Sequence, residues 1–206
     1  MSSCDDHRMI DHLGADFLLR LAGARNGHFR LESGYHGDVW LDDLDGVFRR
    51  PGDLPPLVTA LADRLRAYDP DAVCGPLTGG AFLAQLLARE LGVEFHWTQR
   101  VRAPEAGVLF SAAYALPDGA NLSGRRVAVV DDVVNAGSAV RATLDSVTTG
   151  GGEPVVVGAL LRLGPPDTRP ASIGGARVEA LAEADSFLWE PATCPRCAAG
   201  EPLTQA

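Results

Sequence analysis

The chain contains no lysine, and all 18 of its basic residues are arginines. Any step that needs a lysine amine, as a Schiff-base partner or as a phosphate anchor, is therefore excluded unless a partner supplies the amine. The plainer explanation of the missing lysine is a compositional preference for arginine. The formal net charge is −9, and this acidic balance argues against nucleic acid as a partner.

Long apolar runs are also missing. No stretch of about 18 apolar residues occurs, so we expect no membrane-spanning helix and no membrane partner. Residues 1–6 are polar and acidic, whereas a secretory signal begins with basic and then apolar residues, so we expect a cytoplasmic protein. Only Cys194 and Cys197 among the four cysteines are close in sequence, which does not suit a disulfide framework.

An alternation of helical and strand-like segments begins near Asp53, and 206 residues allow one sizeable core. Helical spacing of apolar residues occurs at 57–65, 80–91 and 137–148. Short apolar strands are predicted at 71–74, 93–98, 126–130 and 154–161. This pattern predicts an α/β fold in which a parallel sheet is covered by helices on both faces. Ligands of such sheets bind at the carboxyl ends of the strands.

The clearest functional signal lies in residues 127–140, where a buried strand leads into Asp131 and Asp132 and then into small residues before a helix. Two carboxylates at a strand end can accept hydrogen bonds from neighbouring ribose hydroxyls. Backbone N–H groups of the small-residue loop and the helix N-terminus suit a phosphate. An isolated Asp-Asp pair often only caps a helix and faces water, but the complete arrangement favours a ligand site. Neither of the common glycine-rich nucleotide loops is present.

This segment resembles the phosphoribosyl-diphosphate-binding motif of the type I phosphoribosyltransferases. Asn135 stands where that family usually has threonine, and it keeps a hydrogen-bonding side chain. Further segments resemble the orotate phosphoribosyltransferase branch of the family: residues 27–34, 73–81, 159–162 and 194–203. Together these similarities extend over nearly the whole chain.

The resemblance implies a role for each matching residue. Asp131, Asp132 and Arg100 would be the catalytic residues. The phosphoribosyl diphosphate would be bound by Asp131, Asp132, Val133, Val134, Asn135, Ala136, Gly137, Ser138, Ala139, Leu77, Thr78, Gly79, Gly80 and Arg100. The base would be bound by Arg162, Trp40 and Asn135. Mg²⁺ would be held mainly through the substrate's own oxygens, so no residue is assigned as a metal ligand.

Several of these residues also have plainer interpretations. The glycines between residues 75 and 80 are compatible with an ordinary strand-to-helix turn, and Arg162 with a surface arginine at a strand end. Trp40 in a short hairpin is compatible with a core aromatic. The Cys194/Cys197 pair has metal-ligand spacing, but no second pair lies nearby in sequence. We therefore expect a structural turn there, with a metal shared with a second subunit as the alternative.

The sequence departs from the orotate enzymes in its positive charges. Those enzymes generally carry lysines in a loop over the active site, whereas residues 98–120 here offer Arg100, Arg102 and no lysine. Glu32 stands where the family often has lysine. Basic groups of such a loop stabilise charge that develops on the leaving pyrophosphate, so turnover is less firmly implied than binding.

The function that the resemblance implies is transfer of the phosphoribosyl group to orotate by a homodimer. The same chemistry on another base, such as a purine, and a non-catalytic sensor of phosphoribosyl diphosphate stay open as alternatives. We expect one domain over residues 1–206, with a core at 51–164. Residues 1–50 and 165–206 are expected to form a hood over the base.

Overall fold

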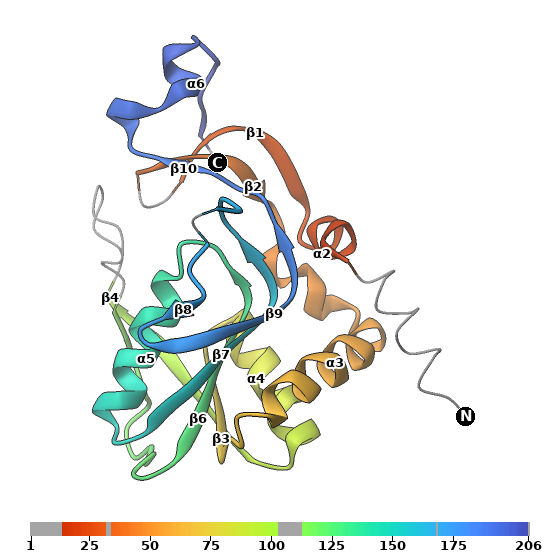
Figure 1. The fold of residues 1–206 in the computed structure, drawn as a ribbon, viewed down its shortest axis with the longest axis vertical. Helices are drawn as coiled ribbons and strands as arrows, with labels where there is room; N and C mark the ends of the chain where they lie inside the picture. Colours follow the sequence, from red (N-terminus) through yellow and green to blue (C-terminus); the bar gives the residue numbers. More distant parts are fainter. Residues whose placement is uncertain (1–13, 32–33, 103–112, 168, 206) are drawn as a thin grey trace.

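The computed structural model describes residues 14–31, 34–102, 113–167 and 169–205. Figure 1 shows a large sheet flanked by helices, with a small sheet at one end of it. The large sheet has the strand order β5-β4-β3-β6-β7-β9-β8. Its strands are β3 (Ala72–Pro76), β4 (Glu94–Arg102), β5 (Ala113–Ala115), β6 (Arg126–Val134), β7 (Glu153–Leu163), β8 (Ser172–Ile173) and β9 (Ala176–Ala184).

The inner strands β4, β3, β6, β7 and β9 pair in parallel, and the edge strands β5 and β8 are antiparallel to their neighbours. The predicted parallel sheet is thus confirmed, and its predicted strands are longer than the sequence pattern indicated. The main extension is in β6, which continues through both aspartates to Val134 instead of stopping at Val130.

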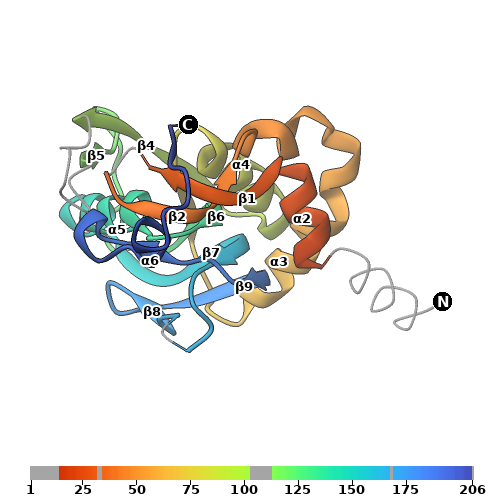
Figure 2. The same cartoon turned by 90° about the horizontal axis from the view of Figure 1, so that it is seen from above.

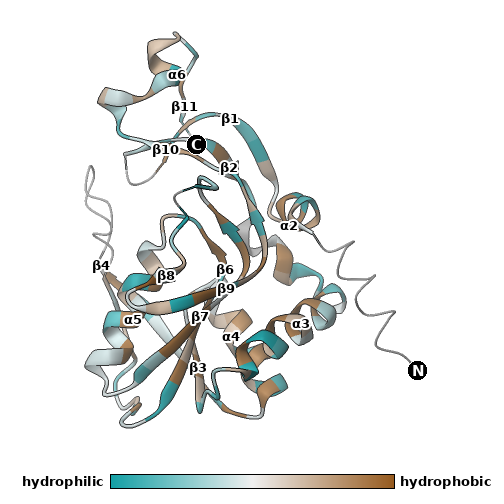
Figure 3. Cartoon of the chain, in the orientation of Figure 1, coloured by the Kyte–Doolittle hydropathy of each residue, from teal (hydrophilic) through white to brown (hydrophobic). Residues whose placement is uncertain are grey.

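Alternate residues of β6 belong to two different apolar clusters. Ala128 and Val130 pack with residues of α3 (Leu54–Arg66) and α4 (Gly79–Leu91), whereas Val127 and Val129 pack with α5 (Ser138–Thr149). Because successive side chains of a strand point to opposite faces, helices cover both faces of the sheet. Figure 3 shows the resulting apolar colouring along the strands of the large sheet. The predicted α/β fold is confirmed.

The small sheet is built from both ends of the chain, in the order β10-β2-β1-β11. Its strands are β1 (Ala24–Arg30), β2 (His36–Leu41), β10 (Leu188–Trp189) and β11 (Thr204–Gln205). The remaining elements are α2 (Ala15–Leu21), η1 (Leu44–Arg49), η2 (Pro51–Asp53), η3 (Pro191–Thr193) and α6 (Pro195–Ala198). Figure 2 shows β1 and β2 crossing above the large sheet when the molecule is seen from above.

The expected hood boundary at residue 165 needs a correction. The strands β8 and β9 lie within the range 165–206, but β9 pairs with β7 over seven residue pairs and so belongs to the large sheet. A buried alternation at Ala176 and Val178 places these side chains in the core cluster beside α5. The small sheet therefore receives its C-terminal strands only from β10 onward.

Among the described helices, none is both long enough and apolar enough to cross a membrane.

Candidate active site at the carboxyl end of the large sheet

The acidic pair, Asp131 and Asp132, lies inside β6 near the carboxyl end of the sheet. The two residues are only 9% and 8% exposed. The backbone N–H of Asp132 donates to Asp131 Oδ1 at 3.1 Å, and the N–H of Val133 donates to Asp132 Oδ1 at 2.8 Å. These local bonds hold both carboxylates in place at the strand end, where a ligand of a parallel sheet binds.

The first turn of α4 packs directly against the acidic pair. A methyl group on Gly80 would lie 2.8 Å from Asp131 Oδ1, and one on Gly79 would lie 2.7 Å from the Asp132 carboxyl carbon. Only glycine leaves room for this approach. Two segments that the sequence analysis assigned to one ligand, 77–80 and 131–132, are thus brought together.

The loop between β3 and α4 continues this surface. Leu77 and Thr78 are exposed, and the peptide bond between them is cis. The N–H of Leu77 donates to the carbonyl of Thr98 at 2.8 Å, which ties the loop to β4. The N-terminus of a 13-residue helix therefore opens beside the acidic pair, with exposed loop residues at its edge.

Two carboxylates in one buried site disfavour each other's charge. Burial raises the pKa of the Asp131 carboxyl well above its usual range, and the charge and hydrogen bond of neighbouring Asp132 raise this pKa further. The positive end of the α4 dipole compensates part of this repulsion. Such a pair binds most readily a ligand that brings hydroxyl donors or a cation.

The loop after β6 is shorter than the sequence analysis expected. Val133 and Val134 belong to β6 and pair with Leu161 and Arg162 of β7, so they lie in the strand and not in the loop. The loop proper is Asn135, Ala136 and Gly137, followed by Ser138 and Ala139 in the first turn of α5. Gly137 has φ of 77°, a backbone conformation that glycine adopts without strain. The loop therefore presents the start of a 12-residue helix at the end of β6.

Arg162 lies on β7 beside Val134, the last residue before this loop. The residue is 9% exposed, and its Nη2 lies 3.3 Å from Glu183 Oε1. The second oxygen of Glu183 is 2.6 Å from Nη1 of Arg169, so one glutamate serves two arginines. The buried Nε of Arg162 has no hydrogen-bond partner among the described residues. Arg162 thus retains an unsatisfied donor near the carboxyl end of the sheet.

Arg100 lies on β4, two residues beyond Thr98. It is exposed, its Nε lies 3.3 Å from the Tyr114 hydroxyl oxygen, and its guanidinium lies 5.7 Å from the Tyr114 ring centre. Thr98 is anchored in turn by a 2.8 Å hydrogen bond to Thr143 of α5. The position of Arg100 is therefore fixed by both neighbouring elements.

Trp40 lies on β2 in the small sheet, where its ring packs against Phe29 with 6.3 Å between ring centres. Its described aromatic contact is thus within the small sheet, and its assignment to the base stays a prediction. Residues 103–112 of the predicted active-site loop, 98–120, lie outside the described residues, as does Glu32.

The comparisons with known proteins decide the family. The family described as phosphoribosyl transferase domain matches residues 56–183, more than half of the chain. The chain belongs to the phosphoribosyltransferase family. The match covers the acidic pair, the loop before α4, Arg100 and Arg162, and it ends within β9.

Curated phosphoribosyltransferases that resemble the chain include two orotate phosphoribosyltransferases. The one from Caldanaerobacter subterraneus subsp. tengcongensis is 32% identical over 90% of this chain and 91% of its own length. The one from Desulforamulus reducens is 30% identical over 92% of this chain and 93% of its own length.

Solved phosphoribosyltransferase structures share the fold. Orotate phosphoribosyltransferase from Mycobacterium tuberculosis has a TM-score of 0.62 and 20% identity, covering 84% of this chain and 95% of its own. Adenine phosphoribosyltransferase from Thermoanaerobacter pseudethanolicus has a TM-score of 0.57 and 22% identity, covering 69% and 87%. At these identities the structures support the fold and do not separate the two bases.

Two contributions were missed by sequence reasoning. One is Arg169, whose nearly buried guanidinium holds Glu183 beside Arg162. The other is a pair of histidines, His28 and His36, which face Cys194 and Cys197. His28 lies in β1 and His36 begins β2. Because the cysteines are far from both histidines in sequence, no local pattern indicated that the four side chains meet.

Proposed function

We propose that this protein transfers the 5-phosphoribosyl group from phosphoribosyl diphosphate to orotate, yielding orotidine 5′-phosphate and pyrophosphate. The observation that carries the proposal is the packing of the acidic pair against Gly79 and Gly80, beside the loop that begins α5. This arrangement offers carboxylates for a ribose and two helix N-termini for phosphates at one edge of the sheet. The orotate phosphoribosyltransferases named above support the choice of acceptor.

In this proposal each part of the site binds a different group of the donor substrate, phosphoribosyl diphosphate. Asp131 and Asp132 accept hydrogen bonds from the ribose hydroxyls. Residues 135–139 hold the 5′-phosphate through backbone N–H groups. Leu77, Thr78, Gly79 and Gly80 hold the pyrophosphate together with Arg100. None of these side chains is placed as a nucleophile, so the reaction is a direct displacement at the ribose carbon that bears pyrophosphate.

Charge determines how this chain promotes the displacement. As the bond to pyrophosphate lengthens, negative charge grows on the leaving group and positive charge on the ribose. Arg100 and the α4 N-terminus face the former, and the carboxylates of the acidic pair face the latter. Because the chain has no lysine, arginine donors must supply all side-chain positive charge.

The acidic pair also fits the Mg²⁺ that phosphoribosyl-diphosphate chemistry uses. Its donors are buried carboxylate oxygens, the ligand type that Mg²⁺ prefers. Burial and then the charge of Asp132 raise the pKa of Asp131, and a bound cation would offset the repulsion between the two carboxylates. Bound with the substrate, the ion neutralises phosphate charge. Asp131 and Asp132 would hold it through the ribose oxygens and water.

Arg162 is the residue proposed to select orotate. Its unpartnered Nε and its burial suit a charge-assisted bond to a carboxylate that enters the site. Glu183 and Arg169 fix the far side of the guanidinium, so the donor is already oriented when the ligand arrives. Trp40 and the amide of Asn135 are proposed as further base contacts. A purine acceptor has no carboxylate that would use Arg162.

A pyrophosphate-release assay with Mg²⁺ and a panel of bases tests the proposal. Wild type should release pyrophosphate with orotate, and the product should be orotidine 5′-phosphate. The double variant Asp131→Asn/Asp132→Asn should lose about 10²–10⁴-fold in kcat/KM, because two charge-assisted bonds of about 1.5–3 kcal/mol each are weakened. Asp145→Asn, on the exposed side of α5, is the matched control.

Each alternative predicts a different result in the same assay. Release with adenine or another purine, and none with orotate, would replace the acceptor but keep the reaction. Binding of phosphoribosyl diphosphate by calorimetry without release with any base would support a sensor and refute the enzyme. The expected homodimer and cytoplasmic location stay predictions, and light scattering on the purified protein measures the former.

A further inference from the structure

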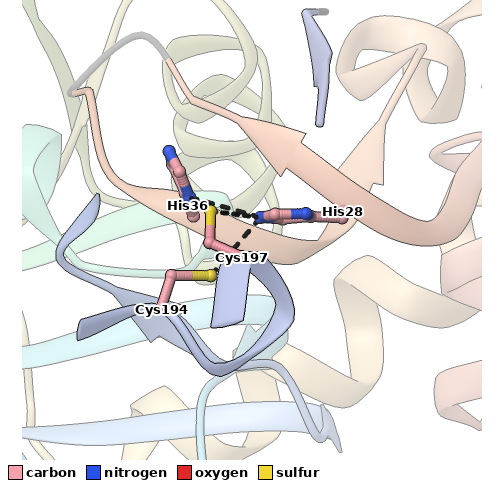
Figure 4. Close-up of side chains that lie close together, drawn as sticks. All are labelled: His28, His36, Cys194 and Cys197. Carbon is pink, nitrogen blue, oxygen red and sulfur yellow. Dashed lines mark hydrogen bonds between the residues drawn. The ribbon is translucent and has the colours of Figure 1, made fainter. Parts of the chain in front are cut away.

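Four side chains that are far apart in sequence meet at the small sheet. We call His28, His36, Cys194 and Cys197 the Cys–His cluster; their ligand atoms all lie within 4.8 Å of one another. Figure 4 shows the two sulfur atoms and the two imidazole rings pointing toward a common centre. His28 comes from β1, His36 from β2, Cys194 from the position just before α6, and Cys197 from within α6.

We propose that the Cys–His cluster is a structural zinc site that fastens the C-terminal tail, residues 191–205, to the N-terminal hairpin. Two thiolates and two imidazoles are the ligand set of a closed tetrahedral zinc site. The inference concerns the small sheet alone and does not depend on the proposed transferase reaction.

Four of the six distances between the ligand atoms lie close to the edges of a zinc tetrahedron, and all six are within 4.8 Å. His28 Nε2 lies 3.2 Å from His36 Nδ1, 3.3 Å from Cys194 Sγ and 3.7 Å from Cys197 Sγ, and Cys197 Sγ lies 3.3 Å from His36 Nδ1. A tetrahedral zinc with ordinary bond lengths separates two nitrogens by about 3.3 Å and nitrogen from sulfur by about 3.6 Å. The side chains therefore need little movement to coordinate one ion.

The outer side of His28 is arranged as in metal sites. Its Nδ1 lies 3.1 Å from the carbonyl oxygen of Glu201, which can only accept, so Nδ1 carries the proton. Nε2 then presents its lone pair to the cluster. A backbone carbonyl that fixes the tautomer of a ligating histidine is a common outer partner of zinc ligands.

The tail has little else to hold it. Cys194 is the only buried residue between positions 191 and 205, and every other residue of that range except Arg196 is exposed. Apart from the cluster, the tail attaches through the two residue pairs that join β11 to β1, the hydrogen bond between His28 and the Glu201 carbonyl, and the contact of the Arg196 guanidinium with the Trp189 ring. Burying one cysteine cannot offset the entropy lost on ordering such a segment, whereas four metal bonds can.

The proximity of the two histidines to the two cysteines also explains the C-x-x-C spacing of Cys194 and Cys197. A C-x-x-C pair supplies half of a zinc site, and the second half comes from the same chain instead of from a second subunit. Three of the four side chains are buried, and Cys197 remains exposed, which leaves a route for the ion. Cys74 and His96 lie elsewhere, on β3 and β4, and are natural controls.

Metal analysis of purified full-length protein tests the proposal. After growth with added zinc and exchange into metal-free buffer, wild type should carry about one zinc per chain by mass spectrometry of the elements. Cys197→Ser and His36→Asn should each lower the zinc content at least about tenfold, since a closed site loses one of its ligands. Cys74→Ala and His96→Gln should keep it.

A second measurement covers variants that fail to fold. Wild-type protein stripped of metal and reloaded with Co²⁺ should show the strong visible bands of a tetrahedral thiolate site. Absence of zinc from wild type both as purified and after zinc addition would overturn the proposal. Zinc retained by both ligand variants, or a Cys194–Cys197 disulfide in the fresh protein by intact mass, would overturn it equally.

Discussion

The acidic pair lies within one strand and meets the first turn of one helix, whereas the Cys–His cluster joins residues as far as 169 positions apart. The first region is built on β6, which is buried on both faces, and needs no ligand to stay ordered. The second lies at the edge of the molecule with almost no apolar support. A sheet that is buried on both faces can hold a costly pair of carboxylates, whereas a tail with one buried residue requires a bound ion.

Removing the zinc ion should cause the largest difference between the region of the Cys–His cluster and the region of the acidic pair. Chelation of the zinc-loaded protein should raise amide exchange in residues 26–31, 34–41 and 188–205 by about 10³-fold, because the tail loses its main attachment. Residues 126–149 should exchange as before, since their order comes from the large sheet. Hydrogen exchange followed by mass spectrometry measures both regions in one sample.

The His96→Gln variant, with its cluster intact, should show the same response to chelation. Equal protection of the tail before and after chelation would contradict the claim that the tail requires a bound ion. It would mean that the strand pairs of β10 and β11 suffice to hold this end of the chain.

Arg162 should show the next largest effect, and in the opposite region. Arg162→Ala should lower kcat/KM for orotate by about 10²-fold, because truncating a buried charged partner costs roughly 2–5 kcal/mol. Arg177→Ala, at an exposed position on β9, should leave kcat/KM unchanged. Steady-state kinetics measures this effect, and thermal melting checks what Glu183 loses when only Arg169 remains as its arginine partner.

An orotate kcat/KM that survives Arg162→Ala would reassign the arginine to a structural partner of Glu183. The Arg162→Lys variant refines this outcome. Lysine keeps the charge but lacks the planar fork, so it should recover only part of the lost activity if the bond to the carboxylate depends on geometry.

The local arrangement of the first region is visible in the sequence, whereas that of the second is not, for a physical reason. Asp131, Asp132 and the loop after them are contiguous, so the pattern of strand, acids and helix carries the site within one segment. The fold followed from apolar spacing because both faces of the sheet are buried. The approach of Gly79 and Gly80 to the acids followed only from the rule that strand ends share one edge.

The Cys–His cluster escaped because nothing local relates Cys194 to His28. Its meeting point depends on the parallel pairing of β11 with β1, which joins the last described residues to the first strand. The strand β9 was misassigned to the hood for a similar reason. Its pairing with β7 and the packing of Ala176 and Val178 in the cluster beside α5 depend on residues distant in sequence.

Gly80 should show how closely the first region is packed. A methyl group there would lie 2.6 Å from Pro76 Cδ and 2.8 Å from Asp131 Oδ1. Gly80→Ala should therefore cost about 1–3 kcal/mol in the free energy of unfolding and move the carboxylate. Gly52→Ala, where nothing lies within 4 Å, should be nearly neutral. Denaturant unfolding compares the two, and equal costs would show that the first turn of α4 can retreat from the acidic pair.

The smallest effect concerns the cost of the acidic pair itself. Because the folded protein raises the pKa of Asp131 above the 3.8 of an ordinary aspartate, the folded state holds its proton where the unfolded state has lost it. Stability is therefore lost as pH rises from about 3.8 through the raised pKa. Asp131→Asn removes this loss and should melt at a higher temperature than wild type at neutral pH, although it is less active.

The gain should shrink as pH falls and vanish near pH 3.8, where the unfolded aspartate also becomes protonated. Thermal melting of the ligand-free proteins from acid to neutral pH follows this difference, with Asp145→Asn as the control on α5. If Asp131→Asn melts below wild type at neutral pH, the surroundings of Asp131 stabilise its carboxylate. The acidic pair would then not lower the stability of the folded protein. A higher melting temperature of Asp131→Asn at neutral pH would show instead that the repulsion between the two carboxylates destabilises the folded protein. The ligand-binding role proposed for the pair would then explain why both carboxylates are present on β6.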